Sequence, residues 1–360
     1  MLSSRTPALV LAPMDGITDA PMRALQGWVG GFSYAVSEFV RVSIEPVPAR
    51  VFLRDVPELA TGAMTPSGMP VQVQILGGDC GRMALSAIAA VRAGATAIDI
   101  NFGCPAPTVN RNDGGASLLR HPLRIRDVVR AVRDAVPTSI PVSAKLRLGW
   151  DSHDSIFENA EMALEGGAEW LTIHARTRVQ GYAPPVFWPA IGDIRERFGV
   201  PVVANGDLFT LDDFRRCQDD TGCMHYMLGR GALANPLLSR QIAEQLGIHA
   251  GPIQVPRGFT DVQHQSASDP DWGGLFRLLM DCTALYSERV AARTLPRLKQ
   301  WAKLARTFGE FPAFDAVKTA KTVDEFFGSL DLRLPDSPHQ EMRGEMDPTT
   351  AASCRESARR

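Results

Sequence analysis

The stretch DINFGCP, residues 99–105, carries the most information about fold and chemistry in this chain of 360 residues. Its apolar residues indicate a buried strand that ends at Asn101, and the glycine turn that follows presents the thiol of Cys104. In a parallel barrel the carboxyl ends of the strands carry the chemistry, so this edge is a candidate site. The alternative is a structural cysteine, because free cysteines are often buried like small apolar residues.

Short apolar runs alternate with longer segments of helical periodicity on both sides of this stretch. We predict strands over residues 9–12, 34–37, 71–76, 97–101, 142–146, 170–174, 201–204 and 224–228. We predict helices over residues 83–93, 125–136, 156–165 and 211–218, among others. Eight strands that alternate with helices over about 250 residues are typical of an α/β protein with a (β/α)₈ TIM barrel.

The pattern changes after the last predicted strand. Residues 1–250 form the predicted barrel, and residues 251–274 are rich in Pro, Gly and Ser and read as a linker. Residues 275–334 are predicted to form an all-helical C-terminal domain, and the polar, proline-broken residues 335–360 are predicted to be disordered.

Composition and charge set broad limits on function. The chain is 45% hydrophobic and 22% charged, with a formal net charge of -2, which is ordinary for a soluble protein. Six scattered cysteines without zinc-finger spacing favour a reducing, cytoplasmic setting and no metal site. No stretch approaches the roughly 20 apolar residues that span a membrane. We also expect a monomer.

The first and third predicted strands offer groups that suit a planar ring. Pro13 and Met14 supply an apolar surface directly after the first strand, although this segment taken alone is better explained as a turn with a helix cap. Gln72 and Gln74 share one face of their strand, so both amides can point into the barrel. A buried amide needs hydrogen-bond partners, which either a ring edge or a satisfied polar layer provides.

Cationic groups follow the fifth and sixth predicted strands. Lys145 and Arg147 share one face, and two buried like charges are unfavourable without an anionic or electron-rich partner. His174 and Arg176 place an imidazole and a second guanidinium at the same rim. We interpret Lys145 and His174 as ligand-binding rather than structural.

The last two predicted strands end in glycine-bearing loops, Asn205-Gly206-Asp207 and Gly229-Arg230-Gly231, each followed by a helix. Backbone N–H groups in such loops can hold a phosphate, and barrel enzymes often place their phosphate site there. The second loop also imitates a dinucleotide fingerprint, but no acidic residue follows at the required spacing. A phosphorylated planar cofactor, FMN, fits these groups best, with Cys104 as a candidate proton donor.

These motifs together resemble the tRNA-dihydrouridine synthases, in particular the bacterial C-type that modifies position 16 of tRNA. The resemblance covers residues 7–330 and rests on the stretches APMDGITDAPMR, SEFVRV, VQVQILG, DINFGCPAPTVNRNDGGASLL, AKLRLGWD, IHARTRVQGY, NGDLFT and LGRGALANP. It implies that NADPH reduces FMN, that the flavin passes a hydride to carbon 6 of a flipped-out uracil, and that Cys104 protonates carbon 5.

The resemblance also implies roles for individual residues. The cofactor would contact Pro13, Met14, Asp15, Gln74, Lys145, His174, Asn205, Gly206, Asp207, Gly229 and Arg230. The uracil and the RNA would contact Arg41, Asn101, Arg147, Arg176 and Tyr182.

A local excess of positive charge supports an RNA partner. Between Arg277 and Arg306 seven cationic residues stand against two acidic ones, and Arg293, Arg297 and Lys303 can share one helix face near Trp301. We therefore add Arg297 and Lys299 to the predicted tRNA contacts. A solvated charged face is the ordinary alternative.

Two rival functions are considered for the whole chain. The first is an FMN barrel that acts on a free small molecule, such as a dihydroorotate dehydrogenase, and the second is an RNA-binding module with a vestigial flavin.

Overall fold

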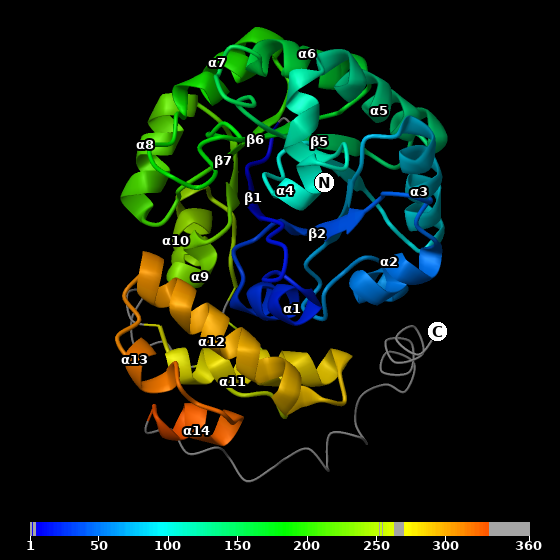
Figure 1. The fold of residues 1–360 in the computed structure, drawn as a ribbon. Helices are drawn as coiled ribbons and strands as arrows, with labels where there is room; N and C mark the ends of the chain where they lie inside the picture. Colours follow the sequence, from blue (N-terminus) through cyan, green and yellow to red (C-terminus); the bar gives the residue numbers. More distant parts are fainter. Residues whose placement is uncertain (1, 3–4, 252, 254, 263–269, 331–360) are drawn as a thin grey trace.

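A closed barrel of eight parallel strands forms the centre of the molecule (Figure 1). The computed structural model describes residues 2, 5–251, 253, 255–262 and 270–330. The strands are β1 (Ala8–Leu11), β2 (Tyr34–Arg41), β3 (Val71–Leu76), β4 (Ile98–Asn101), β5 (Val142–Arg147), β6 (Leu171–His174), β7 (Val202–Asn205) and β8 (His225–Leu228). Each pairs with its neighbour in chain order, and β8 closes the ring against β1. The predicted (β/α)₈ barrel is confirmed.

Strand β2 is longer than the predicted residues 34–37. Its pairing with β3 shifts between Val36 and Phe39, so the alternation of inward and outward residues changes phase at that point. The period-two pattern of the sequence is interrupted there, so the predicted strand ends at residue 37 although β2 continues to Arg41. The irregularity brings Phe39 to the carboxyl end of the barrel, where it lines the cavity described below.

Helices cover the outside of the barrel, as the strands buried on both faces require. The helices of this region are α1 (Ala20–Val29), α2 (Ala49–Asp55), α3 (Cys80–Arg92), α4 (Pro107–Asn110), α5 (Pro122–Ala135), α6 (Ile156–Glu165), α7 (Pro189–Phe198), α8 (Leu211–Thr221), α9 (Gly231–Ala234) and α10 (Leu238–Gln245), of which α4 and α9 begin at the carboxyl end of the barrel. Two 3₁₀ helices, η1 (Pro57–Thr61) and η2 (Gly115–Arg120), lie between them. Helices α3 and α5 to α8 surround the strands in Figure 1.

The C-terminal helices are α11 (Trp272–Tyr286), α12 (Val290–Phe308), α13 (Phe314–Val317) and α14 (Val323–Gly328). They lie together beside α1 and α9 (Figure 1). The rings of Phe276, Trp301 and Phe311 pack edge to face in their core. Trp301, which the sequence placed beside a basic surface, is buried there, and its indole N–H donates to the carbonyl of Leu233.

The boundary of the helical region differs from the prediction. Helix α11 begins at Trp272, inside the segment predicted to be a linker. The side chain of Asp271 accepts a hydrogen bond from the N–H of Gly274, so it caps a first turn whose glycines suggested a loop. The predicted disordered tail, residues 335–360, lies outside the described residues. None of the described helices combines the length and apolar character that a membrane span requires.

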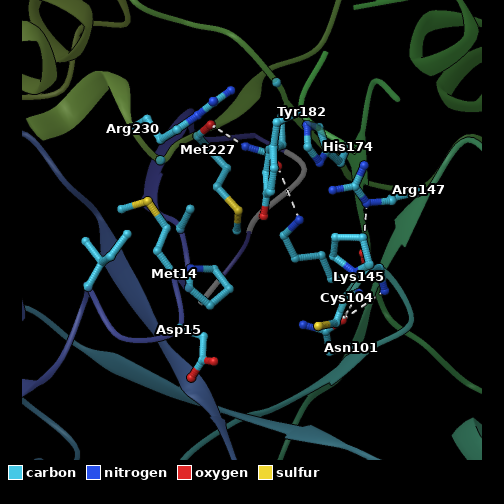
Figure 2. A pocket seen from close by; sticks show the side chains of 18 of the residues that line it. Met14, Asp15, Asn101, Cys104, Lys145, Arg147, His174, Tyr182, Met227 and Arg230 are labelled. Atoms are coloured by element: carbon cyan, nitrogen blue, oxygen red, sulfur yellow. Dashed lines mark hydrogen bonds between the residues drawn. The ribbon is translucent and has the colours of Figure 1, made fainter. Parts of the chain in front are cut away.

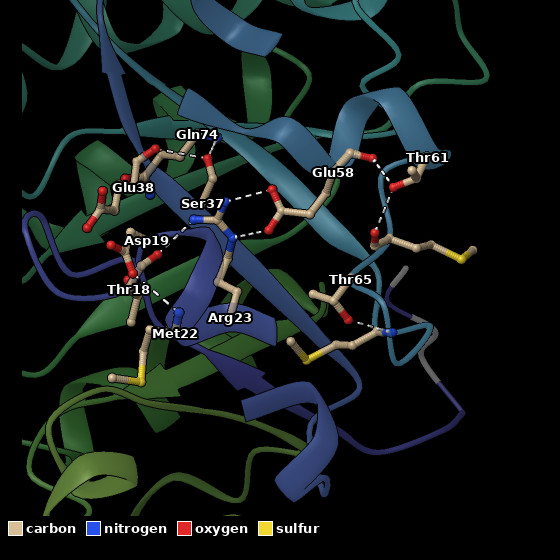
Figure 3. Close-up of polar contacts among 12 residues, drawn as sticks. Thr18, Asp19, Met22, Arg23, Ser37, Glu38, Glu58, Thr61, Thr65 and Gln74 are labelled. Atoms are coloured by element: carbon tan, nitrogen blue, oxygen red, sulfur yellow. Dashed lines mark hydrogen bonds and ion pairs between the residues drawn. The ribbon is translucent and has the colours of Figure 1, made fainter. Parts of the chain in front are cut away.

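A buried ion pair fixes α1 to the element that follows α2 (Figure 3). Arg23 donates to both carboxylate oxygens of Glu58, at 2.7 and 2.8 Å, and both side chains are fully buried. The same guanidinium donates to the carbonyl of Thr18 at 2.7 Å. Arg23 therefore holds the loop between β1 and α1, which borders the cavity.

Candidate active site

The carboxyl ends of the strands surround a cavity of about 550 Å³ (Figure 2). Its volume lies in the range of sites that bury a drug-sized ligand or cofactor. Most of the predicted site residues line it: Pro13, Met14, Asp15, Asn101, Cys104, Lys145, Arg147, His174, Tyr182, Asn205, Gly206, Asp207, Gly229 and Arg230. The sequence therefore predicted correctly which strand ends converge.

An apolar surface forms one side of the cavity. Pro13 and Met14 follow β1, and Met227 of β8 lies beside them. The N–H of Met14 donates to the hydroxyl of Thr18 at 2.8 Å, which fixes the loop. Figure 2 shows Met14 across the cavity from Cys104. A flat ligand placed between them would therefore have the thiol of Cys104 on one side and the apolar surface of Met14 on the other.

The cysteine loop is shaped by the last residue of β4. The side-chain oxygen of Asn101 accepts hydrogen bonds from the N–H groups of Gly103, at 2.8 Å, and Cys104, at 2.9 Å. Its NH₂ group donates to the side-chain oxygen of Gln74 at 2.8 Å. Asn101, predicted to hold the substrate, thus also positions the thiol.

The Cys104 thiol is half-buried and remains protonated at neutral pH. Burial raises its pKa, and the charge of Asp15 acts in the same direction, against the opposing charges of Arg147 and Arg41. A thiol in this state can donate a proton but is a poor nucleophile, because nucleophilic attack requires the thiolate. The site therefore favours an acid role for Cys104.

Arg147 shares the face of β5 with Lys145, as predicted, but carbonyl groups accept its hydrogen bonds. Its guanidinium donates to the carbonyls of Gly103, Thr177 and Gly181 at 2.8 to 2.9 Å. Burial lowers its pKa to about 10. Arg147 consequently ties the cysteine loop to the loop after β6.

The ammonium of Lys145 donates to the side-chain oxygen of Asn205 at 3.2 Å. No ion pair with a carboxylate accompanies this bond in the described part of the chain. Burial, together with the charge of Arg147, lowers the pKa of Lys145 to about 8. Such an ammonium would be stabilised by an anionic or electron-rich ligand in the cavity.

His174 and Tyr182 lie at the upper rim of the cavity in Figure 2. Burial lowers the pKa of His174 well below its ordinary value, so the imidazole is neutral. The Tyr182 ring is 58% exposed, and the guanidinium carbons of Arg147 and Arg230 lie 5.4 and 5.0 Å from its centroid. Tyr182 therefore presents an aromatic face at the mouth.

The loops after β7 and β8 lie in direct contact. A Cβ atom at Gly231 would lie 1.9 Å from the carbonyl oxygen of Leu208, so only glycine allows this approach. The backbone of Gly206 and Asp207 has positive φ, at 130° and 48°. The N–H groups of such a turn can converge on an anion, which supports the predicted phosphate site.

The side chain of Asp207 requires a correction, because a carboxylate repels phosphate. It forms ion pairs with Arg176 and with Arg230, the latter at 2.9 Å. Only its backbone N–H can donate a hydrogen bond to an anion, while its carboxylate orients Arg230. The guanidinium of Arg230 also lies 4.5 Å from the ring of Phe308, the last residue of α12.

Three further residues predicted for the site lie outside the cavity lining. Arg176, predicted to contact RNA, is fully buried, because its guanidinium binds Asp207 and the carbonyl of Ala183. Gln74, predicted to contact the cofactor, is fully buried behind Asn101 and does not line the cavity. Arg41 is partly exposed outside the cavity lining, where it donates to the carbonyl of Thr108.

Arg297, predicted to bind RNA, instead joins the helical region to the barrel. It donates to the carbonyl of Gly16 and forms an ion pair with Asp19 at 2.7 Å. Lys299 is partly exposed, whereas Arg293, Lys303 and Arg306 are exposed, so a basic surface remains on α12. Arg297 is thus a support of the loop that carries Met14 and Asp15.

Separate alanine substitutions should distinguish these two cations of α12. We expect Arg297→Ala to weaken flavin binding, because the loop after β1 loses its contact with α12. Lys299→Ala should leave flavin content unchanged and reduce the slope of log affinity for tRNA against log salt by about 1. Flavin release on denaturation and tRNA binding at several salt concentrations measure both effects. Equal flavin content in both variants would contradict the role of Arg297.

Sequence reasoning missed the contributions of Met227, Thr18 and Phe308. Met227 stands two residues before Gly229 on an inward face, a position that the strand period alone could have indicated. Thr18 is typical of a helix start, so the hydrogen bond that its hydroxyl accepts from the N–H of Met14 was not predicted. Phe308 reaches Arg230 from another part of the chain, and no local pattern signals that contact.

The donor set fits FMN. An apolar surface for a ring, a buried ammonium with a lowered pKa, and backbone N–H groups with a guanidinium for a phosphate line one cavity. Among the described residues, no three His, Cys, Asp or Glu side chains gather as metal ligands do. The fold and the site thus define a barrel enzyme with a cofactor pocket beside a protonated thiol.

Comparison with known proteins gives the family. The model of the dihydrouridine synthase family matches residues 10–265. The chain is 42% identical to the tRNA-dihydrouridine(16) synthase of Aquipseudomonas alcaligenes over 310 residues, which are 86% of this chain and 93% of that protein. It is 41% identical to the enzyme of the same name from Neisseria meningitidis over 321 residues, 88% of this chain and 92% of that protein.

The chain therefore belongs to the dihydrouridine synthase family, whose members are flavin-dependent oxidoreductases that act on tRNA. A structure of 2-naphthoyl-CoA reductase shares the fold, with a TM-score of 0.51 and 11% identity over 66% of this chain and 50% of that one. Family membership excludes the rival in which the barrel serves only to bind RNA.

Proposed function

We propose that this enzyme uses FMN and NADPH to reduce uridine 16 of tRNA to 5,6-dihydrouridine. The observation that carries the proposal is the placement of Cys104 across one cavity from Met14, with Lys145 and the two glycine-bearing loops at its edge. The names of the relatives from Aquipseudomonas alcaligenes and Neisseria meningitidis support position 16. The enzyme acts as a monomer in the cytoplasm.

Residues on both sides of the cavity hold the cofactor. Pro13, Met14 and Met227 would contact the ring, and Lys145 would face its polar edge or ribityl chain. The backbone N–H groups of Gly206, Asp207, Gly229 and Arg230, with the Arg230 guanidinium, would bind the phosphate. His174 contributes a neutral imidazole and Asn205 orients Lys145. The chemistry that bound FMN would supply, once reduced by NADPH, is transfer of a hydride to carbon 6 of the uracil.

The protein supplies the proton and the geometry. The Cys104 thiol donates its proton to carbon 5 from the opposite side, and its raised pKa keeps it in the acid form until that moment. The second N–H of the Asn101 amide and the Arg147 guanidinium bind the uracil edge. The ring of Tyr182 covers the mouth and limits access of water to the reacting atoms.

The substrate base has to leave the folded tRNA to reach this cavity, which costs a few kcal/mol. Contacts distant from the cavity supply that free energy. We propose that Arg41 and Tyr182 contact the RNA near the mouth, and that Lys299, with the exposed Arg293, Lys303 and Arg306, binds phosphates along α12.

A single-base substitution in the substrate tests the proposed position. The purified enzyme should form dihydrouridine in an unmodified tRNA transcript but not in the same transcript with cytidine at position 16. Free uridine serves as the control for the rival activity on small molecules. Dihydrouridine in the cytidine-16 transcript would assign another position, and equal turnover of free uridine would contradict tRNA as the substrate.

Flavin affinity should depend on pH through Lys145. An anionic ligand stabilises the protonated ammonium, so binding raises the pKa of Lys145 from its value of about 8. Affinity is therefore constant below that pKa, and it falls by up to about tenfold per pH unit above it. Fluorescence titration of the apoenzyme with FMN between pH 7 and 9.5 measures the slope. Lys145→Met should flatten the profile, and a wild-type profile without this slope would remove Lys145 from the cofactor site.

A further inference from the structure

A carboxylate inside the barrel has no role in the chemistry described so far. Asp99 of β4 is 2% exposed and accepts two hydrogen bonds, each of 2.6 Å, from the NH₂ group of Gln74 and the hydroxyl of Ser143. Both of its oxygens accept a hydrogen bond, as those of an ionised carboxylate do, and burial raises its pKa only to about 6. The charge of Lys145 acts against this shift, but no described cation forms an ion pair with Asp99, and a charge buried in this way is costly.

The hydrogen bonds of Asp99 continue to the backbone of the cysteine loop. Gln74 donates to Asp99 and accepts from the NH₂ group of Asn101 at 2.8 Å. Asn101 in turn accepts from the backbone N–H groups of Gly103 and Cys104. Two side-chain amides in series therefore join the carboxylate to the cysteine loop.

The ionised carboxylate determines the direction of this chain, because it can only accept hydrogen bonds. The NH₂ end of Gln74 has to face Asp99, which leaves the oxygen of Gln74 facing Asn101. The NH₂ end of Asn101 then faces Gln74, and its oxygen faces the cysteine loop. An amide rotated by 180° at either position would turn N–H against N–H.

We propose that Asp99 is a positioning residue, which orients the Gln74 and Asn101 amides so that Asn101 holds the backbone at Gly103 and Cys104. The proposal deepens the function given above, because the thiol that it positions is the proposed proton donor. It also gives Gln74 a role behind the cavity surface.

Amide hydrogen exchange tests the proposal without cofactor or tRNA. In Asp99→Asn the new NH₂ group can face Gln74, so the amide chain loses its fixed direction. The N–H groups of Gly103 and Cys104 should exchange at least about tenfold faster than in the wild type. Dihydrouridine formation should fall by about 10- to 100-fold, since small displacements of a catalytic group cost that much.

Moving the negative charge from residue 99 to residue 74 should restore the direction of the amide chain. In Asp99→Asn combined with Gln74→Glu, the NH₂ of residue 99 donates to the carboxylate of residue 74, which still accepts from Asn101. The double variant should recover at least about tenfold in turnover over Asp99→Asn, and exchange at Gly103 and Cys104 should slow again. Gln74→Glu alone places two carboxylates face to face and should be the most impaired.

Two further variants separate positioning from a general loss of stability. Ser143→Ala removes the other hydrogen bond of Asp99, so it should lower stability but leave exchange at Gly103 and Cys104 unchanged. Gln74→Met interrupts the chain with Asp99 in place, and it should accelerate exchange even if Asp99→Asn fails to fold. Both should retain bound flavin.

Two results would overturn the proposal: unchanged exchange in Gln74→Met, or a double variant no better than Asp99→Asn. A wild-type enzyme that leaves tRNA unmodified while its variants show the expected exchange would refute the proposed function and keep the positioning role. A fully active wild type whose variants exchange like the wild type would refute the positioning role and keep the proposed function.

Discussion

Replacement of Cys104 by alanine is expected to lower the rate of dihydrouridine formation by about 10²- to 10⁴-fold, the usual contribution of a general acid. The thiol faces the cavity, and burial holds its pKa above the ordinary value, so it carries a proton at neutral pH. No other described cysteine lines the cavity. Single-turnover reaction of the reduced enzyme with unmodified tRNA measures the loss.

The control for this substitution is Cys80→Ala. Cys80 begins α3, is also partly exposed and lies outside the cavity lining, so its loss should leave the rate unchanged. Cys104→Ala should still bind tRNA and flavin like the wild type. Wild-type turnover in Cys104→Ala would disprove the proton-donor role, and loss of tRNA binding would indicate that the substitution disturbed the surface instead.

Replacement of Arg23 by methionine is expected to lower the free energy of unfolding by about 3–5 kcal/mol. Glu58 would remain buried without its cation, and the carbonyl of Thr18 would lose its hydrogen bond. Urea denaturation monitored by circular dichroism measures the change. Flavin affinity should fall too, because Thr18 holds the backbone of Met14.

The matched variant replaces both partners, Arg23→Met with Glu58→Met. An apolar pair of similar volume leaves no buried charge, so most of the lost stability should return. A double variant as unstable as Arg23→Met would show that packing around the guanidinium, rather than the unpaired carboxylate, accounts for the loss.

The sequence could predict the barrel because its signals are local. Strand periodicity, the alternation with helices, and the polar or glycine residues after each strand all lie within short segments. The register irregularity of β2 escaped prediction, since a phase change within a strand removes the signal. The first turn of α11 escaped it because the cap of Asp271 outweighs two glycines.

The roles of charged residues at the site were harder to predict. Arg176 and Arg297 looked like RNA contacts, yet each binds a carboxylate, Asp207 and Asp19 respectively, that lies elsewhere in the chain. A sequence shows which cations are present but not which acids face them. The strand-end pattern already placed Cys104 and Lys145 at the site, whereas the role proposed for Asp99 required the hydrogen-bond geometry.

Helix α12 contacts the barrel at three places around the cavity. Arg297 binds the loop before α1, Trp301 binds the carbonyl of Leu233, and Phe308 lies against Arg230. A protein shortened to the barrel alone would therefore lack the contacts that support two cofactor-binding loops. The smallest unit able to retain flavin should therefore include α12, because this helix is part of the support of the cavity rather than a separate module.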